Sequence, residues 1–92
     1  MTSRLAISNS SLHCDLKGMV AILNSDTGLF YNLNESGAIL WQHLNEPRTV
    51  EELAEILAQK YGLKPEGSRK DTEAIVEQML SAGILQVVGD VD

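Results

Sequence analysis

Residues 29–41 read LFYNLNESGAILW, a pattern that predicts a strand running into a helix with almost no loop between them. Side chains alternate between the two faces of a strand, with Leu29, Tyr31 and Leu33 on one face and Phe30 and Asn32 on the other. The strand carries no charge, although exposed strand edges are usually protected by lysine, proline or charged side chains. The segment therefore indicates either an edge with which another peptide pairs or a strand covered within the core.

The sequence before this segment predicts further strands and a hairpin. Residues 19–24, MVAILN, are a short apolar run between turn signals, which is typical of a buried strand. Residues 25–28, SDTG, suit the hairpin connection, with Gly28 at the position that needs a positive φ. Shorter strands are expected at about residues 5–8 and 12–16, with a turn at Lys17 and Gly18.

A first helix is expected after Asn34, because asparagine is a favourable N-cap. Its apolar stripe has helical spacing and consists of Gly37, Leu40, Trp41 and Leu44. Glycine destabilises a helix interior by roughly 1 kcal/mol relative to alanine. Gly37 therefore indicates either a place where another backbone approaches closely or a glycine that is tolerated near a helix start.

A second helix is expected to begin after Thr49, which forms a capping box with Glu52, and to end at Gly62. Its apolar stripe is Val50, Leu53, Ala54, Leu57 and Tyr61.

Residues 63–68, LKPEGS, are expected to form a loop, and residues 68–71 to cap a third helix. The apolar stripe of that helix is Thr72, Ile75, Val76, Met79, Leu80 and Gly83. Residues 84–88 predict a final strand or an extended tail, and residues 89–92 a frayed end.

This order of elements predicts an α+β fold of the winged helix-turn-helix type, in which a small antiparallel N-terminal sheet precedes three helices. The length of 92 residues favours a single domain, residues 1–92, with a core from about residue 5 to residue 88.

The charge distribution argues against two classes of partner. The net charge is −6, and residues 1–33 are neutral, so the excess acid lies in residues 34–92. Proteins that bind nucleic acid or anionic membranes normally present a basic face.

No apolar run reaches the ~20 residues that span a bilayer, and the first residues lack the apolar region of a signal peptide. A cytoplasmic location is expected, and the single Cys14 allows no internal disulfide.

No set of residues predicts catalysis, a metal site or a cofactor. His13 and Cys14 are neighbours on an expected strand and would point to opposite faces, which suits a nucleophile pair badly. His43 could approach Cys14, but no other residue supports such a pair, so Cys14 is interpreted as a small apolar filler. The carboxylates Glu51, Glu52 and Glu55 are interpreted as a solvated helix face. DNA binding by the third helix is the alternative for this fold, but that helix sets three acidic residues, Asp71, Glu73 and Glu77, against Arg69 and Lys70.

Three segments, FYNLNESGAILWQHL, RTVEELAEILAQKYG and VEQMLSAGIL, together resemble the PqqD-like family over about residues 19–86. Members of this family recognise the leader segment of ribosomally made, post-translationally modified peptides. The resemblance implies a winged-helix domain without catalytic activity or cofactor. It also implies that the leader adds as an antiparallel strand to residues 29–33 and is held on its other side by a helix at about residues 71–82.

Within the family, a free-standing chain of this size resembles the lasso-peptide type, which delivers the precursor to a separate leader peptidase. The alternative is the PqqD-type peptide chaperone of quinone-cofactor biosynthesis, which partners a radical enzyme. This chain lacks the acidic-glycine segment that usually precedes the Leu-Asn step there. The candidate peptide-binding residues are Leu29, Phe30, Tyr31, Asn32, Leu33, Glu73, Ile75, Val76, Met79 and Leu80. Arg69 or Lys70 is a candidate partner for leader carboxylates.

Overall fold

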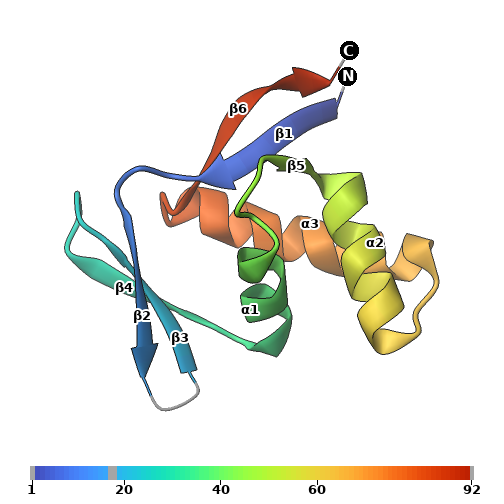
Figure 1. The fold of residues 1–92 in the computed structure, drawn as a ribbon, viewed down its shortest axis with the longest axis horizontal. Helices are drawn as coiled ribbons and strands as arrows, with labels where there is room; N and C mark the ends of the chain where they lie inside the picture. The colour runs from blue at the N-terminus through green and yellow to red at the C-terminus, as the bar shows by residue number, and fades with distance from the viewer. Residues whose placement is uncertain (1, 17–18, 92) are drawn as a thin grey trace.

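The computed structural model describes residues 2–16 and 19–91, which form two antiparallel three-stranded sheets and three helices (Figure 1). The strands are β1 (Thr2–Ile7), β2 (Ser11–Leu16), β3 (Met19–Asn24), β4 (Leu29–Leu33), β5 (Arg48–Thr49) and β6 (Leu85–Val91). The helices are α1 (Glu35–Gln42), α2 (Val50–Tyr61) and α3 (Pro65–Ser81). The predicted α+β class is confirmed, and the bounds of β3 and β4 match the expected ones. The expected turn at Lys17 and Gly18 lies outside the described residues.

The predicted small antiparallel sheet before the helices is confirmed as β2-β3-β4, but β1 belongs to a second sheet. The strand orders are β2-β3-β4 and β5-β1-β6, so β1 leaves its sequence neighbours and pairs with the C-terminal strand. Hydrogen bonds at the β1–β2 connection explain this separation: Ser8 donates from its backbone N–H to the Ile84 carbonyl (3.0 Å) and from Oγ to the Gly83 carbonyl (2.7 Å). These bonds hold the start of the chain against the segment that leads into β6. The expectation that residues 89–92 form a frayed end is wrong for residues 89–91, which lie in β6.

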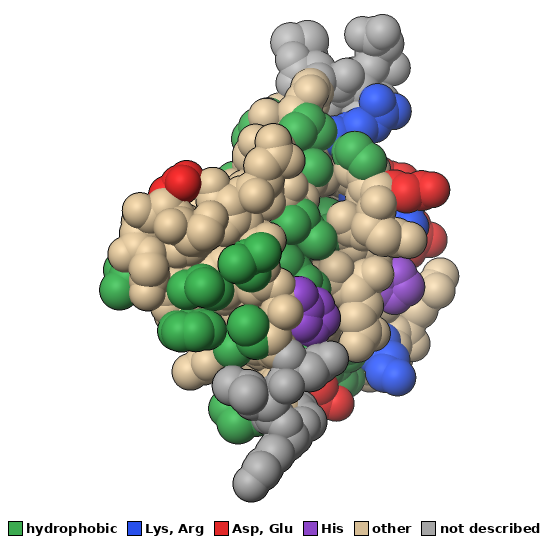
Figure 2. Space-filling model, turned by 60° about the vertical axis from the view of Figure 1, so that its left-hand side comes forward, with side chains coloured by type: hydrophobic (Ala, Val, Ile, Leu, Met, Phe, Trp, Pro, Cys, Tyr) green, Lys and Arg blue, Asp and Glu red, His purple; other side chains and the backbone are tan. Residues whose placement is uncertain are grey.

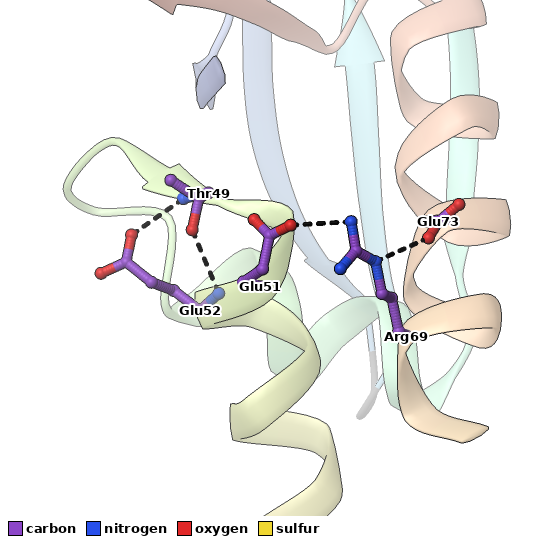
Figure 3. Close-up of polar contacts among 5 residues, drawn as sticks. All are labelled: Thr49, Glu51, Glu52, Arg69 and Glu73. Carbon is purple, nitrogen blue, oxygen red and sulfur yellow. Dashed lines mark hydrogen bonds and ion pairs between the residues drawn. The ribbon is translucent and has the colours of Figure 1, made fainter. Parts of the chain in front are cut away.

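The first two helices begin where their caps predict. The Asn34 Oδ1 accepts a hydrogen bond from the Gly37 N–H (2.8 Å) at the start of α1. At the start of α2, Thr49 and Glu52 exchange side-chain and backbone hydrogen bonds, and Figure 3 shows this capping box. Gly62 ends α2 with φ at 65°. Tyr61 was expected on the buried stripe but is 40% exposed, because the last turn of α2 extends beyond the core.

The start of α3 differs from the expected loop. The helix begins at Pro65, so Gly67 and Ser68 lie inside it. Proline is well suited to the first helical position, where its missing N–H has no intrahelical partner to lose. Ser68 is fully buried and does not cap the helix. Its Oγ donates to the Ala54 carbonyl of α2 (2.6 Å), which ties the two helices together.

The core lies between the helices and the inner face of the β2-β3-β4 sheet. Its most deeply buried large apolar side chains are Ile22, Leu40, Leu53, Met79 and Ile84. Each sheet or helix contributes one face to this cluster, which fixes α3 beside the sheet that contains β4. No helix of residues 2–16 and 19–91 has the length and apolar character needed to cross a membrane.

Candidate functional site

Strand β4 lies at the edge of its sheet. It pairs with β3 on one side, and no other described strand pairs with its second side. Leu29 and Phe30 are 68% and 60% exposed, whereas Leu33, where the strand meets α1, is buried. Of the two interpretations that the sequence left open, the structure favours the edge: β4 presents unpaired backbone groups and uncharged side chains to solvent.

Other edge strands lack this combination of features. Strand β2 is the opposite edge of the same sheet and includes His13 and Asp15. Strand β6 is an edge of the other sheet, and its pairing with β1 is interrupted by a register shift between Arg4 and Leu5. Charges and bulges are the usual means of protecting an edge from pairing with another chain. Strand β4 has neither, so it is the strand best suited to accept a further one.

A groove runs between β4 and α3, and we call it the β4–α3 groove. Its inner pocket, a cavity of about 90 Å³, is lined by Tyr31, Asn32, Leu33, Asn34, Gly37, Ile75, Gln78 and Met79. Its outer pocket is wider, at about 580 Å³, and is lined by Tyr31, Ala74, Glu77, Gln78, Ser81 and Ala82. The Tyr31 hydroxyl donates to the Gln78 Oε1 (2.8 Å), so one hydrogen bond crosses the groove where the two pockets meet.

One end of the groove is fixed by Asn24, a buried polar residue at the end of β3. Its Nδ2 donates to the Ala82 carbonyl (2.9 Å), and its Oδ1 accepts from the Asp26 N–H (3.0 Å). A single side chain therefore shapes the β3–β4 hairpin and holds it to the end of α3. Gly83 follows with φ at 74°, and a Cβ there would lie 2.6 Å from the Asn24 Nδ2.

The other end is closed by side chains packed around Gly37. A Cβ at this position would lie 3.2 Å from the Asn34 Oδ1 and 3.5 Å from the Met79 Cε. The close approach that Gly37 indicated is therefore made by side chains and not by another backbone. Because Met79 belongs to α3, this contact sets the spacing between α3 and the strand-to-helix junction after Leu33.

The ten candidate peptide-binding residues separate into groups. Those that line the inner pocket are Tyr31, Asn32, Leu33, Ile75 and Met79. Leu29 and Phe30 are exposed on β4, Leu80 is partly buried, and Val76 is buried in the core. Met79 has no exposed surface, so a charged substitution there would disrupt the core as well as the pocket.

The charged candidates on α3 are engaged elsewhere. The Arg69 guanidinium pairs with Glu51 of α2 (2.7 Å) and with Glu73 (3.0 Å), and Figure 3 shows it between the two carboxylates. Both pairs are about half exposed and contribute little to stability. These pairs occupy the guanidinium, which argues against the expectation that Arg69 binds leader carboxylates. They also engage Glu73, which is not among the residues that line either pocket.

Sequence reasoning missed the face of α3 that lines the outer pocket. Its members are Ala74, Glu77, Gln78 and Ser81, which recur at i, i+3, i+4 and i+7. This spacing marks a helix face as clearly as the apolar stripe does. The apolar stripe predicts burial, whereas a polar helix face normally lies in solvent and gives no comparable signal. Among the residues that the structure describes, no lysine or arginine lines either pocket of the groove.

The other candidate clusters carry less chemistry. Cys14 is partly buried opposite Ala21 on β3. Among residues 2–16 and 19–91, no group of three or more His, Cys, Asp or Glu side chains could hold a metal ion. Glu52 serves the capping box, and the hydrogen bond from the Thr49 backbone lowers the pKa of its carboxyl. The acidic face of α2 is thus at least partly structural.

Apolar side chains also gather on the outer face of the β2-β3-β4 sheet (Figure 2). Leu12, Leu23 and Phe30 lie opposite one another across the three strands. Leu12 is 52% exposed, and Met19 near the other end of the face is 58% exposed. Phe30 belongs both to this outer face and to the edge strand.

Comparison with known proteins gives a family and several similar folds. The family described as "Coenzyme PQQ synthesis protein D (PqqD)" matches residues 20–85. The solved structure of TbiB1 in complex with the TbiA(beta) leader peptide is 20% identical, with a TM-score of 0.80, and the match covers 92% of this chain and 99% of that one. No curated protein matches.

Two further solved structures have the same fold. A lasso peptide synthetase B1 complexed with the leader peptide is 17% identical, with a TM-score of 0.77 over 89% of this chain and 96% of that one. The PqqD truncation of Methylobacterium extorquens PqqCD, described as a stand-alone RiPP recognition element, is 14% identical. Its TM-score is 0.73 over 90% of this chain and 88% of that one.

Proposed function

This chain belongs to the PqqD family, and from that membership we propose that it binds the leader segment of a ribosomally synthesised precursor peptide. The leader adds as an antiparallel strand to β4 and lays alternate side chains into the β4–α3 groove. The observation that carries the proposal is the uncharged edge of β4, which has one paired side and lies directly beside a lined groove.

Strand addition accounts for both affinity and register. Main-chain hydrogen bonds to the free side of β4 would supply sequence-independent affinity, with a net gain of about 1 kcal/mol each. Side chains that enter the groove would then select one sequence over another. The exposed Leu29 and Phe30 would lose solvent contact beside the added strand, which adds apolar burial.

We further propose that the chain performs no covalent chemistry and presents the bound precursor to a separate maturation enzyme in the cytoplasm. The lasso pathway, in which that enzyme is a leader peptidase, is supported by the two similar folds solved with leader peptides. Quinone-cofactor biosynthesis is the second pathway that the family suggests. DNA binding gains no support, since α3 begins at Pro65 and so adds Glu66 to its excess of carboxylates.

The proposal is tested by fluorescence polarisation with a labelled peptide that copies the leader segment of a candidate precursor encoded near this chain's gene. Backbone N-methylation is introduced at one peptide residue at a time. Strand addition predicts a period of two: alternate positions lose roughly fivefold in affinity, equivalent to about 1 kcal/mol, and the positions between them bind nearly as the parent peptide does.

The binding location is measured on the ¹⁵N-labelled chain by titration with the same peptide. Amide shifts should change along β4 and the groove-lining face of α3, while the edges β2 and β6 serve as internal controls. An N-methylation profile without alternation, or shifts centred on β2 or β6, would contradict binding at β4.

A further inference from the structure

The Tyr31–Gln78 hydrogen bond divides the β4–α3 groove into two compartments. Both residues line the inner and the outer pocket. The 2.8 Å hydrogen bond from the Tyr31 hydroxyl to the Gln78 Oε1 therefore lies where the two pockets meet. The tyrosine comes from β4 and the glutamine from α3, so the bond spans the full width of the groove. A peptide added along β4 would place one side chain before this bridge and another beyond it.

The geometry of a strand fixes the separation of those two side chains. Successive side chains on one face of a strand are two residues and roughly 7 Å apart. The Leu33 end of β4 adjoins Gly37 and the inner pocket, whereas the Leu29 end lies opposite Asn24, which is bonded to the end of α3 at the outer pocket. An antiparallel peptide enters at the Leu33 end, so its earlier residue meets the inner pocket and the residue two positions later meets the outer pocket.

The two pockets differ in chemistry. The inner pocket has a mixed lining, with Asn32, Asn34 and Gln78 beside the apolar side chains. Its inner end, formed by the buried Leu33, Gly37 and Met79, suits an aliphatic side chain. The outer pocket has a largely apolar wall, to which Ala74 and Ala82 contribute, and Glu77 is the one charged residue among the described residues that line it.

Glu77 supplies the carboxylate of the outer pocket. It is exposed on α3 and forms no ion pair within the described residues, in contrast to Glu51 and Glu73, which share Arg69. The other described residues that line this pocket are uncharged, so nothing in the lining neutralises the carboxylate. A cationic side chain is therefore the complement that this pocket lacks.

We propose that the groove selects peptides in which an aliphatic residue is followed, two positions later, by lysine or arginine that pairs with Glu77 in the outer pocket. This inference rests on the proposed strand addition at β4. Glu77 is the specificity-determining residue, and the Tyr31–Gln78 bridge fixes the two-residue spacing because it prevents one side chain from occupying both compartments.

The test is an affinity selection of random twelve-residue peptides displayed on their own mRNA, with the immobilised full chain as bait. The expected result is enrichment of an aliphatic residue, any residue, and then lysine or arginine. In an enriched peptide, replacement of the basic residue by glutamine should weaken binding roughly two- to fivefold, the range of a partly exposed ion pair, and less at high salt.

Matched charge variants identify the pairing residue. With Glu77→Lys as bait, the selected position should change from basic to acidic residues. Glu46→Lys alters the net charge of the chain equally, but Glu46 is exposed in the α1–β5 connection, so it should leave the preference unchanged. With Tyr31→Phe, which keeps the ring and removes the hydrogen bond, peptides with other spacings should also be enriched.

Two outcomes overturn the inference, and they are distinguishable. If enriched peptides shift the amides of β4 but show no preference for a basic residue, or if Glu77→Lys leaves that preference intact, the specificity assignment is wrong and strand addition stands. If no peptide is enriched, or if enriched peptides shift only amides outside β4 and α3, the proposed function fails and this inference fails with it.

Discussion

Replacement of Asn24 by alanine should loosen the joint between the β3–β4 hairpin and α3. The substitution removes the hydrogen bonds to the Ala82 carbonyl and from the Asp26 N–H, both made by a side chain that is only 6% exposed. Each such bond contributes about 1 kcal/mol net. The free energy of unfolding should therefore fall by about 2 kcal/mol, which corresponds to roughly 10 °C in Tm for a domain of this size.

The matched variant Asn24→Asp separates the two bonds. The aspartate keeps an acceptor for the Asp26 N–H but turns a carboxylate oxygen toward the Ala82 carbonyl, where Asn24 has a donor. Protonation restores a donor and is favoured by this environment, so the folded-state pKa of the new carboxyl is raised. The stability deficit relative to the parent chain should consequently shrink as the pH falls from neutral toward 4.

Urea denaturation followed by the fluorescence of Trp41 measures both variants. Ser25→Ala is the control, since Ser25 is exposed in the same hairpin and its hydroxyl donates to the Ser10 carbonyl (3.0 Å). Its effect should stay within about 0.5 kcal/mol. A deficit for Asn24→Ala no larger than that of the control would refute the reasoning, because Asn24 would then not be what joins the hairpin to the helix.

Three further predictions concern single side chains. Thr72→Val should leave the free energy of unfolding unchanged or raise it by up to about 1 kcal/mol, because the buried Thr72 Oγ1 has no hydrogen-bond partner among the described residues; a clear loss in urea denaturation would reveal a missing partner. Glu52→Gln should lower stability at pH 7 by less than about 1 kcal/mol. Because the pKa of Glu52 is lowered from 4.5 by its bond from the Thr49 backbone, this deficit should be present above pH 4.5 and disappear as the pH falls through the folded-state pKa, and a constant deficit in pH-dependent denaturation would contradict the assignment. Gly83→Ala should destabilise the chain by about 2 kcal/mol or more, through its positive φ and the 2.6 Å approach to the Asn24 Nδ2, and a Tm within 2–3 °C of the parent chain would argue against that contact.

Local rules predicted those parts of the fold that local chemistry determines. The Asn34 cap, the Thr49–Glu52 capping box and the Gly28 hairpin involve residues within a few positions of one another, and the structure contains each of them. The start of α3 differs from the prediction because the glycine and proline in LKPEGS are typical of a loop. Ser68 is helical there because its hydroxyl finds an acceptor on α2, which no window of sequence reveals.

The candidate site could likewise be predicted only where it depends on local composition. The uncharged composition of β4 suggested an edge, but which strand becomes an edge depends on β1 pairing with β6, a contact between the two ends of the chain. The outer pocket has no comparable signal in the sequence. Its lining comes from a polar face of α3, and polar residues on a helix normally face solvent with no further role.

The pairing of β1 with β6 has a practical consequence for engineering. Thr2 lies opposite Val91, so both ends of the described chain leave the same end of one sheet, and Figure 1 shows the two termini side by side. Strand β4 belongs to the other sheet. A reporter domain fused at either terminus would thus extend from the β1–β6 pair and leave the groove accessible. A short linker across the termini would also allow circular permutation, with new ends placed in a loop remote from α3.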